Sequence, residues 1–407
     1  MREKHLLLLL LLLAAVVFLG WQNVVELRGE EPRRAVVSME MLFSRSFVVP
    51  QLNGWTYYNK PPLFNWVLIL FFQLFQRFDE WVVRLPSLLS CFAIAGGQFW
   101  MMRRYYDRRT ALLGAFFFLF GAEILLYATP FSGEIDLFFS LLICLQVWSI
   151  YYFFEKKQYW ALFLLSYLFT ALGVLTKGLP ALPFQAFTLL ALFVWKGRWK
   201  MLFGIQHISG ILLLALIVGT YLWAFNQEAA VWLFIVRQYK EAAQRTGLEN
   251  QWFSVLLGAG LVPLELLKLL LPGSLFGLFL LSKRVRQAVF SSDFARFSLL
   301  FILVNFPLYW FSGDFKPRYV YMFFPFFSGL FAVAAVQGLE AFQKTGKGIF
   351  IFWKRLTLLF PIALLSLLLI SEIQGLPNFF LRLGFLLLLA VLVAVLAWQS
   401  KWWLWSV

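Results

Sequence analysis

The chain has 407 residues, of which 62% are hydrophobic and 14% charged, with a net charge of +15 and a mean hydropathy of +0.79. Soluble globular domains are about one quarter charged, so this composition excludes an ordinary soluble protein. Long apolar runs predict an all-α polytopic membrane protein, because a chain in lipid must satisfy its own backbone hydrogen bonds.

The positive charge is concentrated in short loops between the apolar runs, which argues against a nucleic-acid partner. This is the distribution of the positive-inside rule, and it places these loops in the cytoplasm. The loops carry the clusters Arg103–Arg109, Lys156–Lys157, Lys196–Lys200, Lys283–Arg286 and Lys344–Arg355.

The first apolar run, about residues 5–25, follows a basic start and is not followed by a small-residue cleavage site. We interpret it as an uncleaved first span with a cytoplasmic N-terminus. Residues 32–43 and 62–78 are predicted to form two interfacial helices in a first external loop, 26–80. The first begins with Pro at a favoured helix position and has apolar residues at helical spacing, and the second is too short to cross a membrane.

The remaining apolar runs predict a total of about twelve transmembrane helices, with both termini cytoplasmic. A second long external loop is expected at 225–251. Residues 252–281, which contain Pro263 and Pro272, are expected either to be kinked or to be preceded by an external helix. The chain is predicted to be one membrane domain, 1–407, without a C-terminal soluble domain. The spans are placed near 81–102, 110–128, 136–154, 159–176, 179–195, 202–224, 252–281, 295–312, 319–337, 356–373 and 380–399.

On this topology the charges outside the basic loops gather at the external boundary of the membrane. Polar groups are costly near hydrocarbon, so such a cluster indicates a function. Separated segments of the chain contribute Glu30, Glu31, Arg33, Arg34 and Lys60; Glu134 and Asp136; Lys177; Arg237, Lys240 and Arg245; and Asp314, Lys316 and Arg318.

Lysine and arginine side chains are the natural partners of phosphate, and a carboxylate beside them can act as a general base on an acceptor hydroxyl. Glu30 and Arg33 are three residues apart, so they could share a helical face near a helix N-terminus that also favours anions. We therefore expect transfer of a group from a lipid phosphate at the external surface. Tyr57 and Tyr58 are typical of the interfacial aromatic belt, and Tyr58 is also kept as a substrate-contact candidate.

The sequence resembles bacterial aminoarabinose transferase-like glycosyltransferases over roughly residues 1–340. These are GT-C enzymes related to the dolichyl-phosphate-mannose protein mannosyltransferases. The resemblance rests on an ordered series of motifs, of which the first-loop motifs are the most specific: Glu30-Glu-Pro-Arg-Arg34, Val48-Val-Pro-Gln-Leu-Asn-Gly54, Tyr58-Asn-Lys-Pro-Pro-Leu-Phe-Asn-Trp66, Val83-Arg-Leu-Pro-Ser87, Ile135-Asp-Leu, Leu175-Thr-Lys-Gly178 and Lys316-Pro-Arg-Tyr319.

The resemblance implies an inverting transfer from a polyprenyl-phosphate sugar to a lipid, glycan or protein acceptor. Glu30 takes the place of the family's catalytic aspartate, and Arg34 stands where the family has a tyrosine. Asp136 matches the second acid, with Glu134 as a competing candidate and Glu31 as a supporting one. Arg33 and Lys60 would contact the donor phosphate. The donor or acceptor side would be lined by Lys177, Arg237, Lys316, Arg318 and Tyr319.

The sequence ends at Trp405-Ser-Val407, shortly after the last predicted span. We therefore expect no C-terminal soluble domain like that of aminoarabinose transferases proper, and the resemblance does not imply a lipid A acceptor. No resident cofactor is expected, although external carboxylates could hold a divalent metal beside substrate phosphate. The expected location is a bacterial inner membrane with the active site on its periplasmic face. Two alternatives stay open, a flippase or transporter of lipid-linked sugars and a non-catalytic membrane scaffold.

Overall fold

The computed structural model describes residues 26–126, 132–245, 252–310 and 315–343. The chain divides into one compact unit of residues 22–335 and a second unit of residues 1–21 and 336–407. The fold and the site described below belong to the first unit. The predicted spans at 5–25, 356–373 and 380–399 lie outside the described residues, so the total number of spans stays a prediction.

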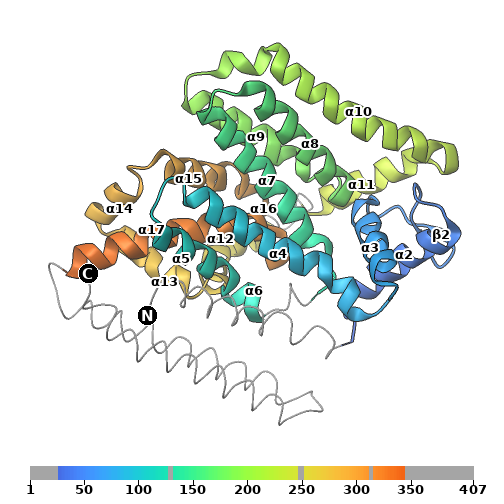
Figure 1. Cartoon of the computed structure of the whole chain (residues 1–407), viewed down its shortest axis with the longest axis horizontal. Helices are drawn as coiled ribbons and strands as arrows, with labels where there is room; N and C mark the ends of the chain where they lie inside the picture. Colours follow the sequence, from blue (N-terminus) through green and yellow to red (C-terminus); the bar gives the residue numbers. More distant parts are fainter. Residues whose placement is uncertain (1–25, 127–131, 246–251, 311–314, 344–407) are drawn as a thin grey trace, which may run out of the picture. The chain divides into compact units, whose positions relative to one another are not determined.

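Helices make up most of the described chain, as the composition predicts (Figure 1). Two short strands, β1 and β2, form an antiparallel hairpin in the first loop. In chain order the elements are α2 (Glu31–Ser44), β1 (Gln51–Leu52), β2 (Trp55–Thr56), α3 (Leu63–Phe75), α4 (Glu80–Met102), α5 (Arg108–Leu119), α6 (Ala122–Leu126), α7 (Ile135–Glu155), α8 (Tyr159–Lys177), α9 (Ala181–Trp195), η1 (Trp199–Phe203), α10 (Ile205–Glu228), α11 (Val231–Arg245), α12 (Trp252–Leu269), α13 (Gly273–Gly277), η2 (Leu278–Leu281), α14 (Lys283–Val289), α15 (Asp293–Asn305), α16 (Pro307–Trp310), η3 (Pro317–Phe323) and α17 (Phe324–Gln343).

Five helices in the described ranges are long and apolar enough to cross a membrane, and the number rises to seven if two sharply bent pairs each count as one span. The five are α4, α7, α8, α10 and the segment Pro317–Ala341. One bent pair, Gly260–Leu269 with Gly273–Leu281, turns by 117° at the predicted kink. The second pair, Lys283–Val289 with Asp293–Trp310, turns by 97° just before the predicted span at 295–312.

The predicted span at 110–128 is interrupted in the structure. Helix α5 ends at Leu119, and the short helix α6 begins at Ala122. The backbone N–H of Ala122 donates to the carbonyl of Leu271, 2.7 Å away, instead of continuing the helical ladder. A long-range backbone hydrogen bond therefore replaces an intrahelical one. Such a bond cannot be predicted from the spacing of apolar residues in the sequence.

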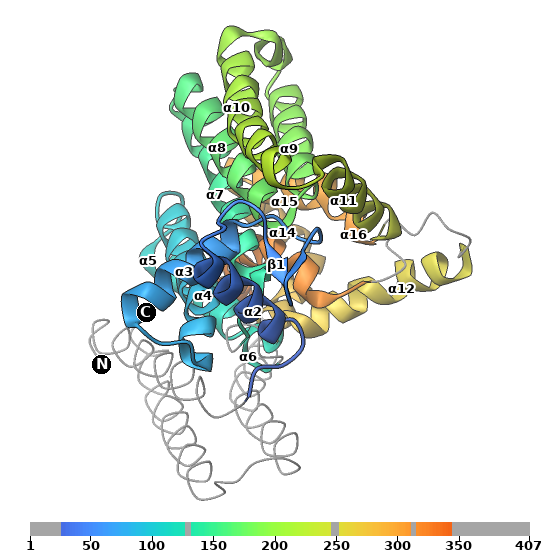
Figure 2. The same cartoon turned by 90° about the vertical axis from the view of Figure 1, so that its right-hand side faces the viewer.

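Helix α7 is the central helix of the unit, because it packs against α4, α8, α9 and η3. Helix α8 also contacts α10, and these two lie side by side at one end of the unit (Figures 1 and 2). A buried hydrogen-bonded network connects the middle of this bundle, in which the amide of Gln185 accepts from Gln146 and Thr170 and donates to Ser166. Apolar helices have little hydrophobic drive to associate in lipid, so such polar contacts help to align them.

The first loop is a folded platform of two helices and a hairpin. Helices α2 and α3 pack against each other and bury Phe64, Leu68 and Phe72. The hairpin turn is Asn53-Gly54, and both residues have positive φ, which suits a two-residue hairpin loop. Glu40 of α2 accepts from the backbone N–H groups of Asn53 and Gly54 at 2.7 and 3.1 Å. The predicted two helices are confirmed; their position at the membrane interface stays a prediction.

Candidate active site

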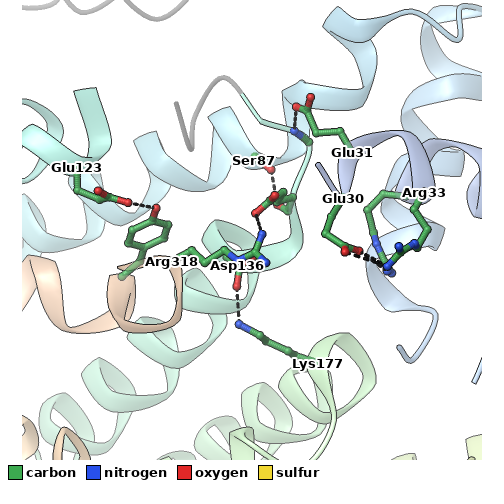
Figure 3. Close-up of polar contacts among 12 residues, drawn as sticks. Glu30, Glu31, Arg33, Ser87, Glu123, Asp136, Lys177 and Arg318 are labelled. Atoms are coloured by element: carbon green, nitrogen blue, oxygen red, sulfur yellow. Dashed lines mark hydrogen bonds and ion pairs between the residues drawn. The ribbon is translucent and has the colours of Figure 1, made fainter. Parts of the chain in front are cut away.

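The polar residues of the candidate site come from the ends of several elements of the first unit. Glu30 precedes α2 and Arg33 lies in its first turn, while Glu134 precedes α7 and Asp136 lies in its first turn. Lys177 ends α8 and Arg318 belongs to η3 (Figure 3). The sequence predicted that these separated segments meet, and they do. Hydrocarbon-spanning helices bring their ends to one level, which explains why the polar residues at those ends can share one cluster.

Glu30 is the residue that immediately precedes α2. It does not cap the helix; instead both of its carboxylate oxygens accept from Nη1 of Arg33, at 2.9 and 2.7 Å. The two side chains are 38% and 41% exposed, so the pair is accessible to a ligand. Gly29, directly before it, has a φ of +61° and lies close to Glu134, so that a β-carbon there would be 3.5 Å from the Glu134 carboxylate.

Asp136 and Lys177 form a buried ion pair, with Nζ of Lys177 at 2.5 Å from Oδ1 of Asp136. Lys177 also lies over two aromatic rings, 5.1 Å from the centre of Phe139 and 4.8 Å from the centre of Tyr319. Both charges are 6% exposed or less. A buried pair of this kind needs good geometry to offset its desolvation, and here the aromatic faces add to the stabilisation of the ammonium.

Glu134 and Arg318 form a second ion pair, at 2.7 Å, beside the first. Burial raises the pKa of the Glu134 carboxyl above its ordinary value, and the neighbouring Asp136 acts in the same direction, whereas Arg318 opposes the shift. The guanidinium of Arg318 also lies 5.7 Å from the ring centre of Tyr319. Arg318 and Lys177 therefore flank the same tyrosine, which joins the two ion pairs into one cluster.

Glu31 is directed to a different place from Glu30 (Figure 3). It is 2% exposed and accepts two 3.1 Å hydrogen bonds from Arg84 of α4, as well as backbone N–H groups of Arg28 and Gly133. These contacts tie the start of α2 to α4 and to the segment before α7. A carboxylate so fully bonded is suited to holding the loop in place and is poorly suited to accepting a substrate proton.

Helix α11 holds the loop that contains Tyr58 and Lys60. The amide of Gln238 donates to the backbone oxygens of Tyr58 and Asn59, each at 3.0 Å, and Arg237 donates from Nε to Oδ1 of Asn59 at 2.8 Å. Tyr58 packs against a cluster that includes Leu175, Phe225 and Phe234. The Tyr58 ring therefore packs against other side chains of the protein and is not a lipid-facing aromatic of the interfacial belt.

Two lysines named from the sequence, Lys60 and Lys316, lie in the segments that lead into α3 and η3, and both are partly buried. Sequence reasoning missed four residues that shape the site: Arg84, Asn59, Gln238 and Tyr57. A signal existed for Arg84, because it is a lone arginine in an apolar run. Tyr57 was interpreted as a belt aromatic; it is 6% exposed and accepts a hydrogen bond from Arg34.

Among the described residues, no group of three histidine, cysteine, aspartate or glutamate side chains is placed to hold a metal ion. Cys91 and Cys144 are both buried and unpaired by disulfide. The described site contains several arginine and lysine side chains, among them Arg33 and Arg318, that could contact an anionic ligand.

Comparison with known proteins gives a consistent result. Residues 59–225 match the model of the dolichyl-phosphate-mannose-protein mannosyltransferase family. The chain is 24% identical over 336 residues to an undecaprenyl phosphate-alpha-4-amino-4-deoxy-L-arabinose arabinosyl transferase of Shewanella sediminis, covering 79% of this chain and 57% of that protein. It is 28% identical over 252 residues to the protein of the same name from Erwinia tasmaniensis, covering 58% of this chain and 43% of that protein.

The fold is shared with a solved structure. The crystal structure of ArnT from Cupriavidus metallidurans bound to undecaprenyl phosphate matches with a TM-score of 0.72 at 19% identity, covering 98% of this chain and 71% of that one. The chain spans about half the length of the sequence relatives named above. The resemblance predicted from the sequence is confirmed: the chain is similar to these arabinosyl transferases and has the GT-C membrane fold of the solved ArnT structure.

Proposed function

We propose that this ArnT-like chain is a membrane glycosyltransferase that moves a sugar from a polyprenyl-phosphate donor to an acceptor at the external face of the membrane. The observation that carries the proposal is the meeting of the accessible Glu30–Arg33 pair with the Glu134–Arg318 and Asp136–Lys177 pairs in one cluster. Support for the donor class comes from the ArnT structure, which was solved with undecaprenyl phosphate bound.

In the proposed reaction the acceptor hydroxyl or amine attacks the anomeric carbon of the sugar as the bond to the polyprenyl phosphate breaks, so the configuration inverts. Glu30 takes the acceptor proton, because among the acids of the cluster it combines an accessible carboxylate with a neighbouring cation. The leaving phosphate keeps the electron pair of the broken bond. Its charge is stabilised by Arg33 and Lys60, with Arg237, Lys316, Arg318 and Tyr319 lining the donor or acceptor side.

Asp136 and Glu134 have supporting roles in this proposal. The Asp136–Lys177 pair is too buried to meet an acceptor directly, and it fixes the end of α8 against the start of α7. Glu134 is less buried, at 15%, and stays the second candidate for the base. The periplasmic location of the site is supported by the basic loops, since Arg103–Arg109 follow the opposite end of α4 from Arg84.

Replacing Glu30 tests the proposal directly. In proteoliposomes, Glu30→Gln should lower transfer from a purified polyprenyl-phosphate sugar by at least about 100-fold, because an amide accepts no proton, while affinity for undecaprenyl phosphate is kept. The donor would be isolated from a deletion strain that accumulates it and identified by mass spectrometry.

Glu134→Gln is the matched control for the choice of base, and it should leave more activity than Glu30→Gln. Arg33→Ala and Lys60→Ala should weaken binding of undecaprenyl phosphate by about tenfold each, the loss expected for one charge-assisted contact. The proposed mechanism assigns the stabilisation of the phosphate charge to side chains, so we expect a chelator to leave the rate unchanged. Full turnover by Glu30→Gln would remove Glu30 from its role and reopen the flippase and scaffold alternatives.

A further inference from the structure

Two arginines of opposite exposure flank the Glu30 carboxylate. Arg33 is 41% exposed, and its Nη1 donates to both oxygens of the carboxylate. Arg34 is 3% exposed, and its Nη2 lies 3.7 Å from the nearer Glu30 oxygen. The exposed Arg33 side chain can therefore reach a ligand, whereas the Arg34 guanidinium is enclosed by the protein.

Arg34 is held in place by Tyr57. Its Nη2 donates to the Tyr57 hydroxyl, and its guanidinium carbon lies 5.2 Å from the centre of the tyrosine ring. Tyr57 is itself buried in a cluster with Val37, Met41 and Ile69. The backbone N–H of Tyr57 donates to the carbonyl of Pro50 at 2.8 Å, across the base of the hairpin. The guanidinium of Arg34 thus has a position fixed by α2 and the hairpin together.

A buried guanidinium needs a negative charge nearby, because an unpaired buried charge is costly. Glu30 supplies it. The same carboxylate is also the group that must lose its contact with Arg33 if that arginine turns to the donor phosphate, as the proposed function requires. Glu134, which precedes α7, also faces Glu30 and repels its negative charge, so a Glu30 carboxylate without a neighbouring cation would take up a proton more readily. A protonated base cannot act. Arg34 is a second cation that stays beside Glu30 when Arg33 turns to the donor phosphate.

We propose that Arg34, oriented by Tyr57, is the fixed counter-ion of Glu30: it keeps the carboxylate ionised and directed into the site when Arg33 is engaged by donor phosphate. This inference rests on the proposed function. Arg34 is a positioning residue, since it acts through Glu30 and touches no reacting atom.

The test is the pH dependence of turnover at saturating donor. For Arg34→Gln we expect kcat at neutral pH to fall about 10-fold to 100-fold, within the range of general-base effects. We expect the acidic limb of the pH–rate profile to move up by about one pH unit, the usual effect of one lost neighbouring cation. The KM for the donor should change less than about twofold, whereas Arg33→Ala should raise that KM by about tenfold.

Two conservative variants keep the test independent of folding. Arg34→Lys retains the charge and should keep the acidic limb in place. Tyr57→Phe retains the ring and removes the hydroxyl that holds Arg34, so it should shift the limb in the same direction as Arg34→Gln, by less. If Arg34→Gln does not fold, a wild-type kcat and acidic limb in Tyr57→Phe would overturn the inference.

Arg45→Asn is the charge control. Arg45 is exposed at the other end of α2, with a φ of 58° that asparagine tolerates. Arg45→Asn should leave both kcat and the acidic limb unchanged. If it shifted the acidic limb as much as Arg34→Gln does, the shift would be a general effect of net charge and would contradict the inference. A lower melting temperature of Arg34→Gln with an unaltered pH profile would assign Arg34 a merely structural role. Failure of the proposed function is a separate outcome, because it appears as full activity of Glu30→Gln.

Discussion

At the scale of single residues, the cluster separates accessible charges from enclosed ones. Glu30 and Arg33 are about 40% exposed, whereas Asp136, Lys177, Glu31 and Arg84 are exposed by 6% or less. Enclosed ion pairs hold elements in register, because removing one partner leaves an uncompensated charge. Accessible pairs can exchange their partner for a ligand.

The Asp136–Lys177 pair can be tested by a double-mutant cycle. Asp136→Asn leaves the Lys177 ammonium buried and unpaired, which we expect to destabilise the protein by about 3–5 kcal/mol. The variant that also carries Lys177→Met has no buried charge at either position and should recover much of that loss. Melting temperatures in one detergent give the comparison, and a double variant as unstable as the sum of the two single variants would contradict the pairing.

The raised pKa of Glu134 predicts a pH dependence of stability. An acid whose pKa is raised on folding binds more protons in the native state than in the unfolded state, so stability is greatest below its ordinary value of 4.5 and falls as pH rises through the raised pKa. Glu134→Gln is neutral at every pH and should lack this component. The measurement is the melting temperature of both proteins from about pH 4 to pH 8, and parallel curves would refute the assignment.

At the scale of elements, the junction of α8 and α11 positions the phosphate-binding side of the proposed site. Gly178 ends α8 with a φ of 82°, and a β-carbon there would meet Oε1 of Gln238 at 2.2 Å. The same Gln238 holds the backbone of Tyr58 and Asn59. The absence of a side chain at one glycine therefore allows α11 to reach the loop that carries Lys60.

Gly178→Ala should displace Gln238 and loosen the loop at Lys60. We expect a lower melting temperature and weaker binding of undecaprenyl phosphate. Gly197→Ala is the matched control, because Gly197 also has a positive φ, 65°, and no atom within 4 Å of a built β-carbon. It should cost only the backbone strain of about 1–2 kcal/mol and leave binding unchanged. If Gly178→Ala and Gly197→Ala lowered the melting temperature and the binding of undecaprenyl phosphate equally, the result would argue against the α8–α11 contact.

At the scale of the whole molecule, the proposed function requires that the site face one side of the membrane and the basic loops the other. The first loop and α11 both offer exposed positions outside the site, such as Trp55 and Tyr239, at 80% and 67% exposure. The turn after α7 offers Lys157 on the predicted cytoplasmic side. The two native cysteines are buried, which suits labelling by introduced cysteines.

We expect Trp55→Cys and Tyr239→Cys to react with a membrane-impermeant maleimide in intact spheroplasts. Lys157→Cys should react only after the membrane is permeabilised, because the basic loops are retained on the cytoplasmic side. Activity of each variant serves as the folding control. If Trp55→Cys and Tyr239→Cys reacted from opposite sides of the membrane, the first loop and α11 could not belong to one site, and the proposal would be wrong.

The sequence by itself determined the class of protein and the positions of the long apolar helices. Hydrophobic runs and loop charges act locally, so they can be interpreted without knowing which helices are neighbours. For this reason α4 (Glu80–Met102), α7 (Ile135–Glu155) and α8 (Tyr159–Lys177) lie close to their predicted ranges. The acids and cations that would serve a lipid phosphate were also identifiable, because charges in an apolar chain are conspicuous.

Only the tertiary structure decided which charges pair and how far each is enclosed. Glu30 and Glu31 are adjacent and identical in type, yet one is accessible beside Arg33 and the other is locked to Arg84, 53 residues further along. Tertiary packing also decided two other features, the break between α5 and α6 and the contact of Gln238 with the Tyr58 loop. These features depend on contacts between residues distant in sequence, and such contacts form only when the helices pack.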